Sequence, residues 1–438
     1  MLVHLVSVFV ALGASLVDGR TSIGNASQTL NRFAFGSCND QSKPQMLWPV
    51  ITARDPQLWL WLGDNIYGDI RKWDKDTLTN GVFRPAPPEV LKEKYELQLS
   101  HPDYKVFRER FPIIGIWDDH DYGINDGDKN YLYKKESQQL FLDFLDEPRD
   151  SPRRQQEGIY TSYEYGQGDQ RVKFILLDNR YHRDPYSTPG GDFLGEAQWK
   201  WLENELMTTT ATFNVIASGI EILPNDRWYK IGETWSKFPA SRTRLLNLIQ
   251  TSRASGVILL SGDVHYAEIH QVNCGSKYAL TEITTSGMTH SWKHFNLASR
   301  IGIIPSIGFT LANMILPWQY RVRPDEYYGG FNFADMHFDW KASPPTAHVS
   351  VLGRDGRTKL QQVIPATRFE GDAPETCDSI HELDPTEYLI RKVAVVVVLG
   401  SLLISVLVNM VVVVVLPLQL LWLLVAGSSG SKAKVKTP

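Results

Sequence analysis

The sequence contains little cysteine, little net charge and no basic block in the body of the chain, and each shortage limits what the protein can be. The formal net charge of −4 gives no electrostatic reason to expect a nucleic-acid partner. With three cysteines, an exported chain leaves one thiol outside its own disulfides. The composition also lacks the bias of a disordered chain, because 43% of the residues are hydrophobic and 21% are charged. The 438 residues are enough for one large globular domain or two.

Residues 1–19 are typical of a secretory signal peptide. An apolar run from Leu5 to Leu12 is followed by small residues, and the sequence suits cleavage after Gly19. A glycosylation sequon follows at Asn25, on the expected surface tail. Both features predict a glycoprotein of the secretory pathway or cell surface, with the main body of the chain in a lumen or outside the cell.

The C-terminal part contains a long apolar run without charges. Residues 393–427 exceed the ~20 residues that cross a bilayer, so the sequence predicts one tilted or kinked transmembrane helix there. The lysines that follow favour a cytoplasmic tail at 428–438. The polar residues 371–392 would form a stalk, and the membrane is therefore an expected partner.

Between these ends, short apolar runs alternate with helical patterns. The runs begin near residues 32, 58, 111, 172, 213, 256 and 278, and the helical patterns cover 88–99, 136–146, 195–207 and 241–252. The runs are continuously apolar rather than alternating, which is expected of strands covered on both faces. This order predicts an α/β layered fold whose polar strand ends collect along one edge of the sheet. A late hairpin is also predicted, with Asp355 and Gly356 in its turn.

Four of the predicted strands end in side chains that bind metals. These side chains are Cys38; Asp64 and Tyr67; Asp118, Asp119, His120, Asp121, Asn125 and Asp126; and Asp263 and His265. Any one group alone could be an ion pair or a helix cap. Together they indicate a metal site, because acids that share one edge cannot all ionise without cations to balance them.

Five motifs carry a resemblance to a known family. In order and spacing, "GSCN", "GDNIYGD", "WDDHDYGIND", "LLDNRYHR" and "SGDVHYAE" resemble the alkaline phosphatase D family of metallophosphoesterases over roughly residues 30–345. The resemblance implies the four-layer αββα sandwich of calcineurin-like phosphoesterases, as a single catalytic domain at 30–370.

The ligand types predict two different metals. Cys38, Tyr67 and His265 with Asp64 form a soft, anionic set that suits ferric iron. Asp64, Asp119, Asn125 and Asp263 offer oxygen alone, which suits calcium. Asp64 would bridge the two ions, and the resemblance implies the same pairing of Fe³⁺ and Ca²⁺.

Cysteine 38 has two other interpretations, a buried thiol or half of a disulfide. If Cys38 binds metal, Cys274 and Cys377 are left as a possible disulfide, consistent with an oxidising compartment.

The motifs also contain candidate catalytic groups. The resemblance makes Arg180 a clamp on phosphate oxygens, although it could simply pair with Asp178. His120 is a candidate acid for the leaving oxygen, or it orients the aspartate ligands beside it. Asp118 and Asp121 are expected to support the ligands rather than to bind metal. His290 could line the pocket or could be solvated.

These features predict a metal-dependent hydrolase of phosphate monoesters or diesters that acts outside the cytosol. Two alternatives stay open: a membrane-tethered calcium-binding protein without catalysis, and a related hydrolase specialised for lipid or nucleic-acid diesters. The apolar segment 300–324 is either a buried helix or lid over the pocket, or a contact with the membrane surface.

Overall fold

The computed structural model describes most of the chain between residues 26 and 422. The described residues are 26–72, 82–224, 233–252, 254–273, 279–294, 309, 310, 313, 321–323, 326–368, 378, 379, 385–419 and 422. The predicted signal peptide, the sequon at Asn25, the proposed disulfide partners Cys274 and Cys377, the tail at 428–438 and nearly all of segment 300–324 lie outside these residues. The chain divides into two compact units, 1–306 with 320–380 and 307–319 with 381–438.

The second unit contains helix α10, Pro385–Met410, followed by a π-helical turn at Val411–Val415. No helix among the described residues has both the length and the hydropathy needed to cross a membrane. The predicted span at 393–427 is therefore not supported.

The first unit contains two larger sheets. In the first sheet the strand order is β15-β14-β13-β1-β2-β5. The bounds are β1 Arg32–Gly36, β2 Trp59–Leu62, β5 Ile113–Ile116, β13 Asn332–Asp339, β14 Thr346–Gly353 and β15 Thr358–Pro365. Strands β1, β2 and β5 are parallel, whereas β13, β14 and β15 join them antiparallel. The predicted late hairpin is confirmed as β14 and β15, with Gly356 in a left-handed conformation in its turn (φ 68°).

In the second sheet the order is β12-β10-β11-β9-β8-β7-β6, with β16 beside β10. The bounds are β6 Thr161–Tyr165, β7 Val172–Leu176, β8 Phe213–Ala217, β9 Val257–Ser261, β10 Ala267–Asn273, β11 Leu280–Thr285, β12 Tyr327–Tyr328 and β16 Asp378–Ser379. Strands β7, β8, β9 and β11 are parallel neighbours. A separate small hairpin joins β3 Ile70–Arg71 to β4 Phe83–Arg84.

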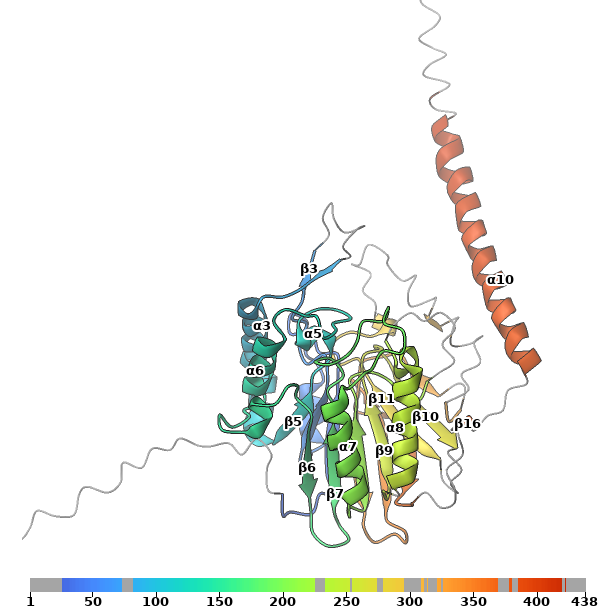
Figure 1. The fold of residues 1–438 in the computed structure, drawn as a ribbon. Coiled ribbons are helices and arrows are strands. Elements are labelled where there is room, and N and C mark those ends of the chain that lie inside the picture. The colour runs from blue at the N-terminus through green and yellow to red at the C-terminus, as the bar shows by residue number, and fades with distance from the viewer. Residues whose placement is uncertain are drawn as a thin grey trace, which may run out of the picture. The chain divides into compact units, whose positions relative to one another are not determined.

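Helices cover the outer faces of the two sheets (Figure 1). Their bounds are α1 Trp48–Ala53, α3 Pro88–Ser100, α4 Pro102–Arg110, α5 Asp119–Tyr122, α6 Lys134–Phe144, α7 Glu196–Thr208 and α8 Pro239–Ser252, with short 3₁₀ turns at Pro152–Arg154, Trp235–Lys237 and Trp292–His294. Trp48 of α1 stacks edge-on against Trp59 of β2, with ring centroids 5.2 Å apart. On the second sheet, α7 and α8 pack their Leu202 and Leu245 into one cluster with Ile216 of β8.

The inner faces of the sheets pack against each other. Phe33 of β1 meets Phe174 of β7 edge-to-face at 5.0 Å, and Phe213 of β8 lies 4.9 Å from Phe338 of β13. Every residue of β2, β7 and β9 is buried, because each strand has a sheet on one side and helices on the other. The predicted α/β fold is confirmed, and it forms here because these runs are apolar on both faces.

The carboxyl ends of the parallel strands meet between the two sheets. After β1, the Ser37 hydroxyl donates to the carbonyl of Thr285 at the end of β11, at 2.9 Å. The next residue, Cys38, lies 2.9 Å from the hydroxyl of Ser286. This edge, as expected for parallel strands, is where the predicted metal-binding side chains gather.

Candidate metal centre

Tight turns at the strand ends aim the candidate ligands at one another. Cys38, Asp64, Asp126, Asp263 and His265 all have left-handed backbone, with φ between 50° and 71°. Side chains other than glycine rarely adopt this conformation, and it clusters at functional sites. Among the described residues, only two other non-glycine positions share it, and both are exposed loop aspartates. This rare backbone conformation therefore occurs in the same segments in which the sequence predicted metal-binding side chains.

The soft ligand set is brought together around Asp64. Its Oδ2 lies 3.4 Å from the Cys38 thiol and 3.1 Å from the Tyr67 hydroxyl. The same hydroxyl lies 3.1 Å from Nε2 of His265. Cys38 is buried and has a free thiol, so it is not half of a disulfide in this structure. Sulfur, phenol, imidazole and carboxylate therefore converge on one point.

A second histidine joins this set. Nε2 of His290 lies 3.2 Å from Nε2 of His265, and its ring packs edge-on against Tyr67 with centroids 4.8 Å apart. Burial lowers the pKa of His265 to about 3 and also lowers the pKa of His290. Both rings are therefore neutral at pH 7 and can act as ligands, because a ring nitrogen binds metal in the neutral form. The interpretation of His290 as a solvated loop residue is wrong.

Asp119 and His120 begin helix α5 beside the same aspartate. The carboxyl oxygens of Asp64, Asp118 and Asp263 lie within 4.8 Å of one another, and those of Asp64 and Asp119 approach a nitrogen of His120 equally closely. The Asp119 carboxylate accepts hydrogen bonds from two backbone amides, those of His120 and Asp126, both at 2.7 Å. The oxygen-rich set is thus contiguous with the soft set through Asp64.

His120 is held by a carboxylate that the sequence reasoning did not assign. Its Nδ1 lies 2.8 Å from Oδ1 of Asp69, and its ring stacks on Tyr67 at a centroid distance of 4.1 Å. Burial lowers the pKa of His120, but the charges of Asp119 and Asp64 outweigh it, so the pKa is raised well above its usual range. The ring is positioned and protonated by its neighbours.

Arg180 lies at the other end of the acidic set and is completely buried. Its Nε and Nη2 lie 2.8 and 2.5 Å from Oδ1 of Asp118, and Nη2 also donates to Glu233. It does not pair with the side chain of Asp178, which instead accepts from the amide of Arg180 at 2.8 Å. The guanidinium is thus engaged by two carboxylates, and its Nη1 faces the carbonyl of Gly127 at 3.4 Å.

Asp121 has a purely structural position. Its carboxylate accepts from the amides of Asn65, Ile66 and Asp118 at 2.8, 3.2 and 3.0 Å. It therefore fixes the turn after β2 and caps α5. Asp118 is placed differently, since it both binds Arg180 and lies in the carboxyl cluster.

The acids have more negative charge than their surroundings can balance. Burial raises the pKa of Asp64, Asp118 and Asp263 well above the usual range, and neighbouring carboxylates add to the rise. The same causes raise the pKa of the Cys38 thiol and the Tyr67 phenol. Oδ1 of Asp64 and Oδ2 of Asp118 are buried without a hydrogen-bond partner. Buried acceptors left unpaired at the centre of an anionic cluster fit bound cations.

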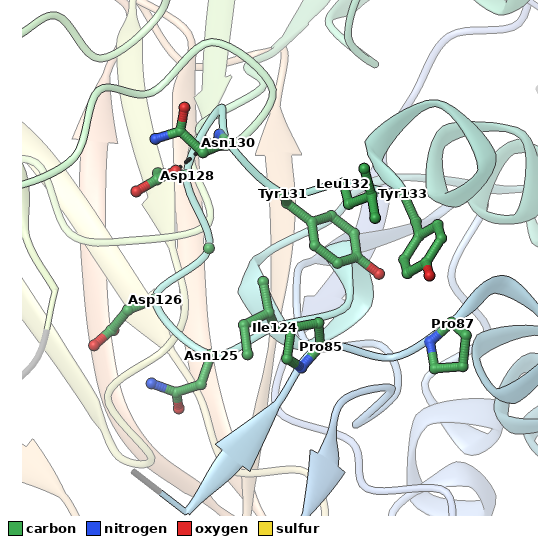
Figure 2. A pocket seen from close by; sticks show the side chains of 11 residues that line it. Pro85, Pro87, Ile124, Asn125, Asp126, Asp128, Asn130, Tyr131, Leu132 and Tyr133 are labelled. Carbon is green, nitrogen blue, oxygen red and sulfur yellow. Dashed lines mark hydrogen bonds between the residues drawn. The ribbon is translucent and has the colours of Figure 1, made fainter. Parts of the chain in front are cut away.

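A pocket of about 590 Å³ opens next to the cluster (Figure 2). Asn125 and Asp126 form one end of it, and Asp126 also lies within 4.8 Å of Asp119 and Glu233 through their carboxyl oxygens. Asn125, predicted as a calcium ligand, is half-buried on this loop. The pocket and the acidic set therefore share a wall.

Three residues of the site were missed by the sequence reasoning, namely Asp69, Glu233 and Ser286, whereas His290 was left open between lining the pocket and being solvated. Asp69 closes the motif "GDNIYGD", so its place beside a strand end was a usable signal. Glu233 is a lone acid outside every motif, and nothing in the local pattern identifies it. Ser286 and His290 follow strand β11, whose end carries no acidic residue.

The chain is similar to proteins of a known family. A family model described as PhoD-like phosphatase matches residues 33–298. Over 304 residues the chain is 25% identical to alkaline phosphatase D of Bacillus subtilis (strain 168), a match that covers 58% of this chain and 51% of that relative. The chain thus spans about half the length of this curated relative.

Among solved structures, that of PhoD matches with a TM-score of 0.56 at 16% identity, and the match covers 85% of this chain and 78% of the other. At this level of identity the likeness shows the fold.

Proposed function

The chain belongs to the PhoD-like phosphatase family, and we propose on this premise that it is a metal-dependent hydrolase of phosphate esters. The observation that carries the proposal is the cluster around Asp64. A thiol, a phenol, an imidazole and several carboxyl groups converge there. The cluster is buried, and its negative charge is not balanced by the surrounding side chains. A site of this composition suits phosphoryl transfer, in which charge on phosphate oxygens must be neutralised.

The residues present fit the two metals that the sequence indicated. Cys38, Tyr67 and His265 with Asp64 would hold iron, and Asp64, Asp119, Asn125 and Asp263 would hold calcium. When bound, such ions polarise a phosphoryl group and make a bound water nucleophilic at neutral pH. The additional neutral ring of His290 beside His265 supports the soft half of the site.

His120 is proposed as the acid that protonates the leaving oxygen. Asp69 accepts from Nδ1, so the ring cannot turn away and the proton for transfer would be carried on Nε2. The ring also stacks on Tyr67 at a centroid distance of 4.1 Å, which fixes its orientation. Both contacts hold the ring in place, as a general acid requires.

Arg180 is proposed as the phosphate clamp, acting once Glu233 has moved away from it. In the structure Asp118 and Glu233 occupy its donors. Asp118 would keep the guanidinium in place, while the phosphate would take the position of the Glu233 carboxylate. Arg183, 3.7 Å from Glu233, lies where it could stabilise the same charge.

We propose further that the reaction takes place in a secretory compartment or at the cell surface. The predicted signal peptide and the sequon at Asn25 support this location. Loss of a glycan from the expressed protein after treatment with an N-glycosidase would agree with it. A protein without a glycan, whose catalytic body is digested by protease when the plasma membrane alone is permeabilised, would contradict it.

The function is tested with purified protein, a panel of phosphate monoesters and diesters, and metal analysis of the same sample. We expect turnover that chelation abolishes and added metal restores. His265→Gln should lose iron and turnover, whereas His348→Gln, an exposed histidine on β14, should keep both. Bound calcium without iron and without turnover of any ester would instead favour the non-catalytic calcium-binding protein.

A further inference from the structure

The pocket beside the metal centre has walls formed by two loops (Figure 2). Pro85 and Pro87 come from the loop between β4 and α3, and the opposite wall is the loop 124–133. Figure 2 shows Asn125 and Asp126 at one end, Pro85 and Ile124 in the middle, and the tyrosines and Leu132 towards the other end. At about 590 Å³ the pocket is within the size range of small-molecule sites.

The two walls are held together by hydrogen bonds, so the pocket is pre-formed. The Tyr131 hydroxyl donates to the carbonyl of Ala86 at 2.6 Å, and the amide of Ala86 donates to the carbonyl of Gly123 at 2.9 Å. The Tyr122 hydroxyl donates to the carbonyl of Asp128 at 3.1 Å. A ligand would therefore bind without first ordering these loops.

One end of the pocket is directly connected to the acidic set. The amide of Asp126 donates to Oδ2 of Asp119 at 2.7 Å, and the carboxyl oxygens of Asp126, Asp119 and Glu233 lie within 4.8 Å of one another. A phosphate held at the metal centre would thus have this pocket next to it. The part of the substrate that extends furthest from the phosphate is its alcohol group.

The lining of the pocket is largely apolar, and its charged groups are acidic. Its apolar part consists of Pro85, Pro87, Ile124, Tyr131, Leu132 and Tyr133. The charged groups of the described lining are carboxylates, Asp126 and Asp128. Leu132 is 77% exposed, so it contributes to this wall without being needed in the core. An apolar surface with an acidic end favours an apolar ligand and disfavours a further anionic group on it.

We propose that this pocket binds the alcohol group of the substrate, and that the preferred substrates are phosphate esters of apolar alcohols that carry no further anionic group on the alcohol. The inference rests on the proposed hydrolysis of phosphate esters and adds the substrate class. Esters of alkyl or aryl alcohols fit it, whereas sugar diphosphates and nucleoside polyphosphates do not.

The test uses ethyl, butyl and hexyl phosphate, whose leaving alcohols have nearly the same acidity. In the wild-type protein kcat/KM should rise along the series, by up to about fourfold per buried methylene group. Leu132→Asp should flatten the rise in kcat/KM with chain length. The matched control is Val363→Asp, which should keep the rise in kcat/KM. Val363 is half-exposed on β15, at the edge of the first sheet opposite β5.

Charge selectivity is tested with an analogue of hexyl phosphate that ends in a carboxylate. It should be turned over at least about tenfold less efficiently than hexyl phosphate, and Asp128→Asn should narrow that gap. Equal kcat/KM for ethyl and hexyl phosphate, or a rise that survives Leu132→Asp, would overturn the substrate class alone. Failure to turn over any ester would overturn the proposed function, and this inference with it.

Discussion

Arg180 and Asp118 form a buried ion pair that joins the two sheets at the metal centre, with Nε and Nη2 of the guanidinium 2.8 and 2.5 Å from Oδ1 of the carboxylate. Asp118 follows β5 of the first sheet, and Arg180 follows β7 of the second. The pair therefore has two roles: it ties the strand ends together, and it keeps a cation beside a cluster of acids.

Removing the guanidinium should destabilise the fold. Arg180→Met leaves the buried Asp118 carboxylate without its guanidinium partner, and such a loss typically costs about 3–5 kcal/mol. Arg171→Met, which breaks a half-exposed pair with Glu164, should cost only about 0–1 kcal/mol. Denaturant unfolding of the metal-free proteins measures both. Equal stability of the two variants would show that the buried pair contributes little.

Glu233 should compete with phosphate for Arg180. Glu233→Gln removes the competing charge, so inorganic phosphate should inhibit the variant at least about tenfold more strongly, since a hydrogen bond to a charged group contributes about 1.5–3 kcal/mol. The inhibition constant is measured together with metal content, which should not change. Unchanged or weaker inhibition would rule out a clamp that Glu233 covers.

The acid role of His120 predicts a dependence on the leaving group. His120→Asn should slow the hydrolysis of an alkyl phosphate by about 10²-fold or more, because an alkoxide leaves poorly without a proton. A nitrophenyl ester, whose leaving group needs no proton, should be affected much less. If both esters lose the same factor and metal is lost as well, His120 only orients the aspartates beside it.

His270 should make stability depend on pH, away from the metal centre. Its side chain is 2% exposed, and Nε2 lies 3.0 Å from Glu268 and 3.6 Å from Glu221. Arg321 also binds Glu268, and the Tyr266 hydroxyl donates to the same carboxylate. Burial lowers the pKa of His270, but the two carboxylates outweigh it and raise the pKa to about 10.

Because this folded-state pKa lies above the unfolded value of about 6.5, the stabilisation is complete below pH ~6.5 and is lost as pH rises towards 10. Wild-type protein should thus be more stable than His270→Gln at pH 6, and the difference in unfolding free energy should shrink by pH 10. A difference that is constant across this range would mean that His270 is neutral in the folded protein.

Much of the candidate site was predictable because its candidate ligands lie at the ends of continuously apolar strands. Cys38, Asp64, Asp119 and Asp263 each follow such a strand, and the parallel order of the sheets brings those ends together. Glu233 could not be predicted, since it reaches Arg180 from a segment with no strand or motif, through a contact that only the folded chain creates.

The engagement of Arg180 by Asp118 and Glu233 was unpredictable for the same reason. The sequence offered Asp178 only as an alternative partner to phosphate, and that carboxylate accepts from the backbone amide of Arg180 instead.

The central claim, that Asp64 joins an iron site to a calcium site, is tested most directly by elemental analysis of purified wild-type protein and of three variants. Wild type should contain both metals. Cys38→Ser should lose iron, Asp263→Asn should lose calcium while keeping most of its iron, and Asp64→Asn should lose both metals together with turnover. A wild-type protein that hydrolyses esters without either metal, or an Asp64→Asn variant that keeps both metals and its activity, would contradict the account.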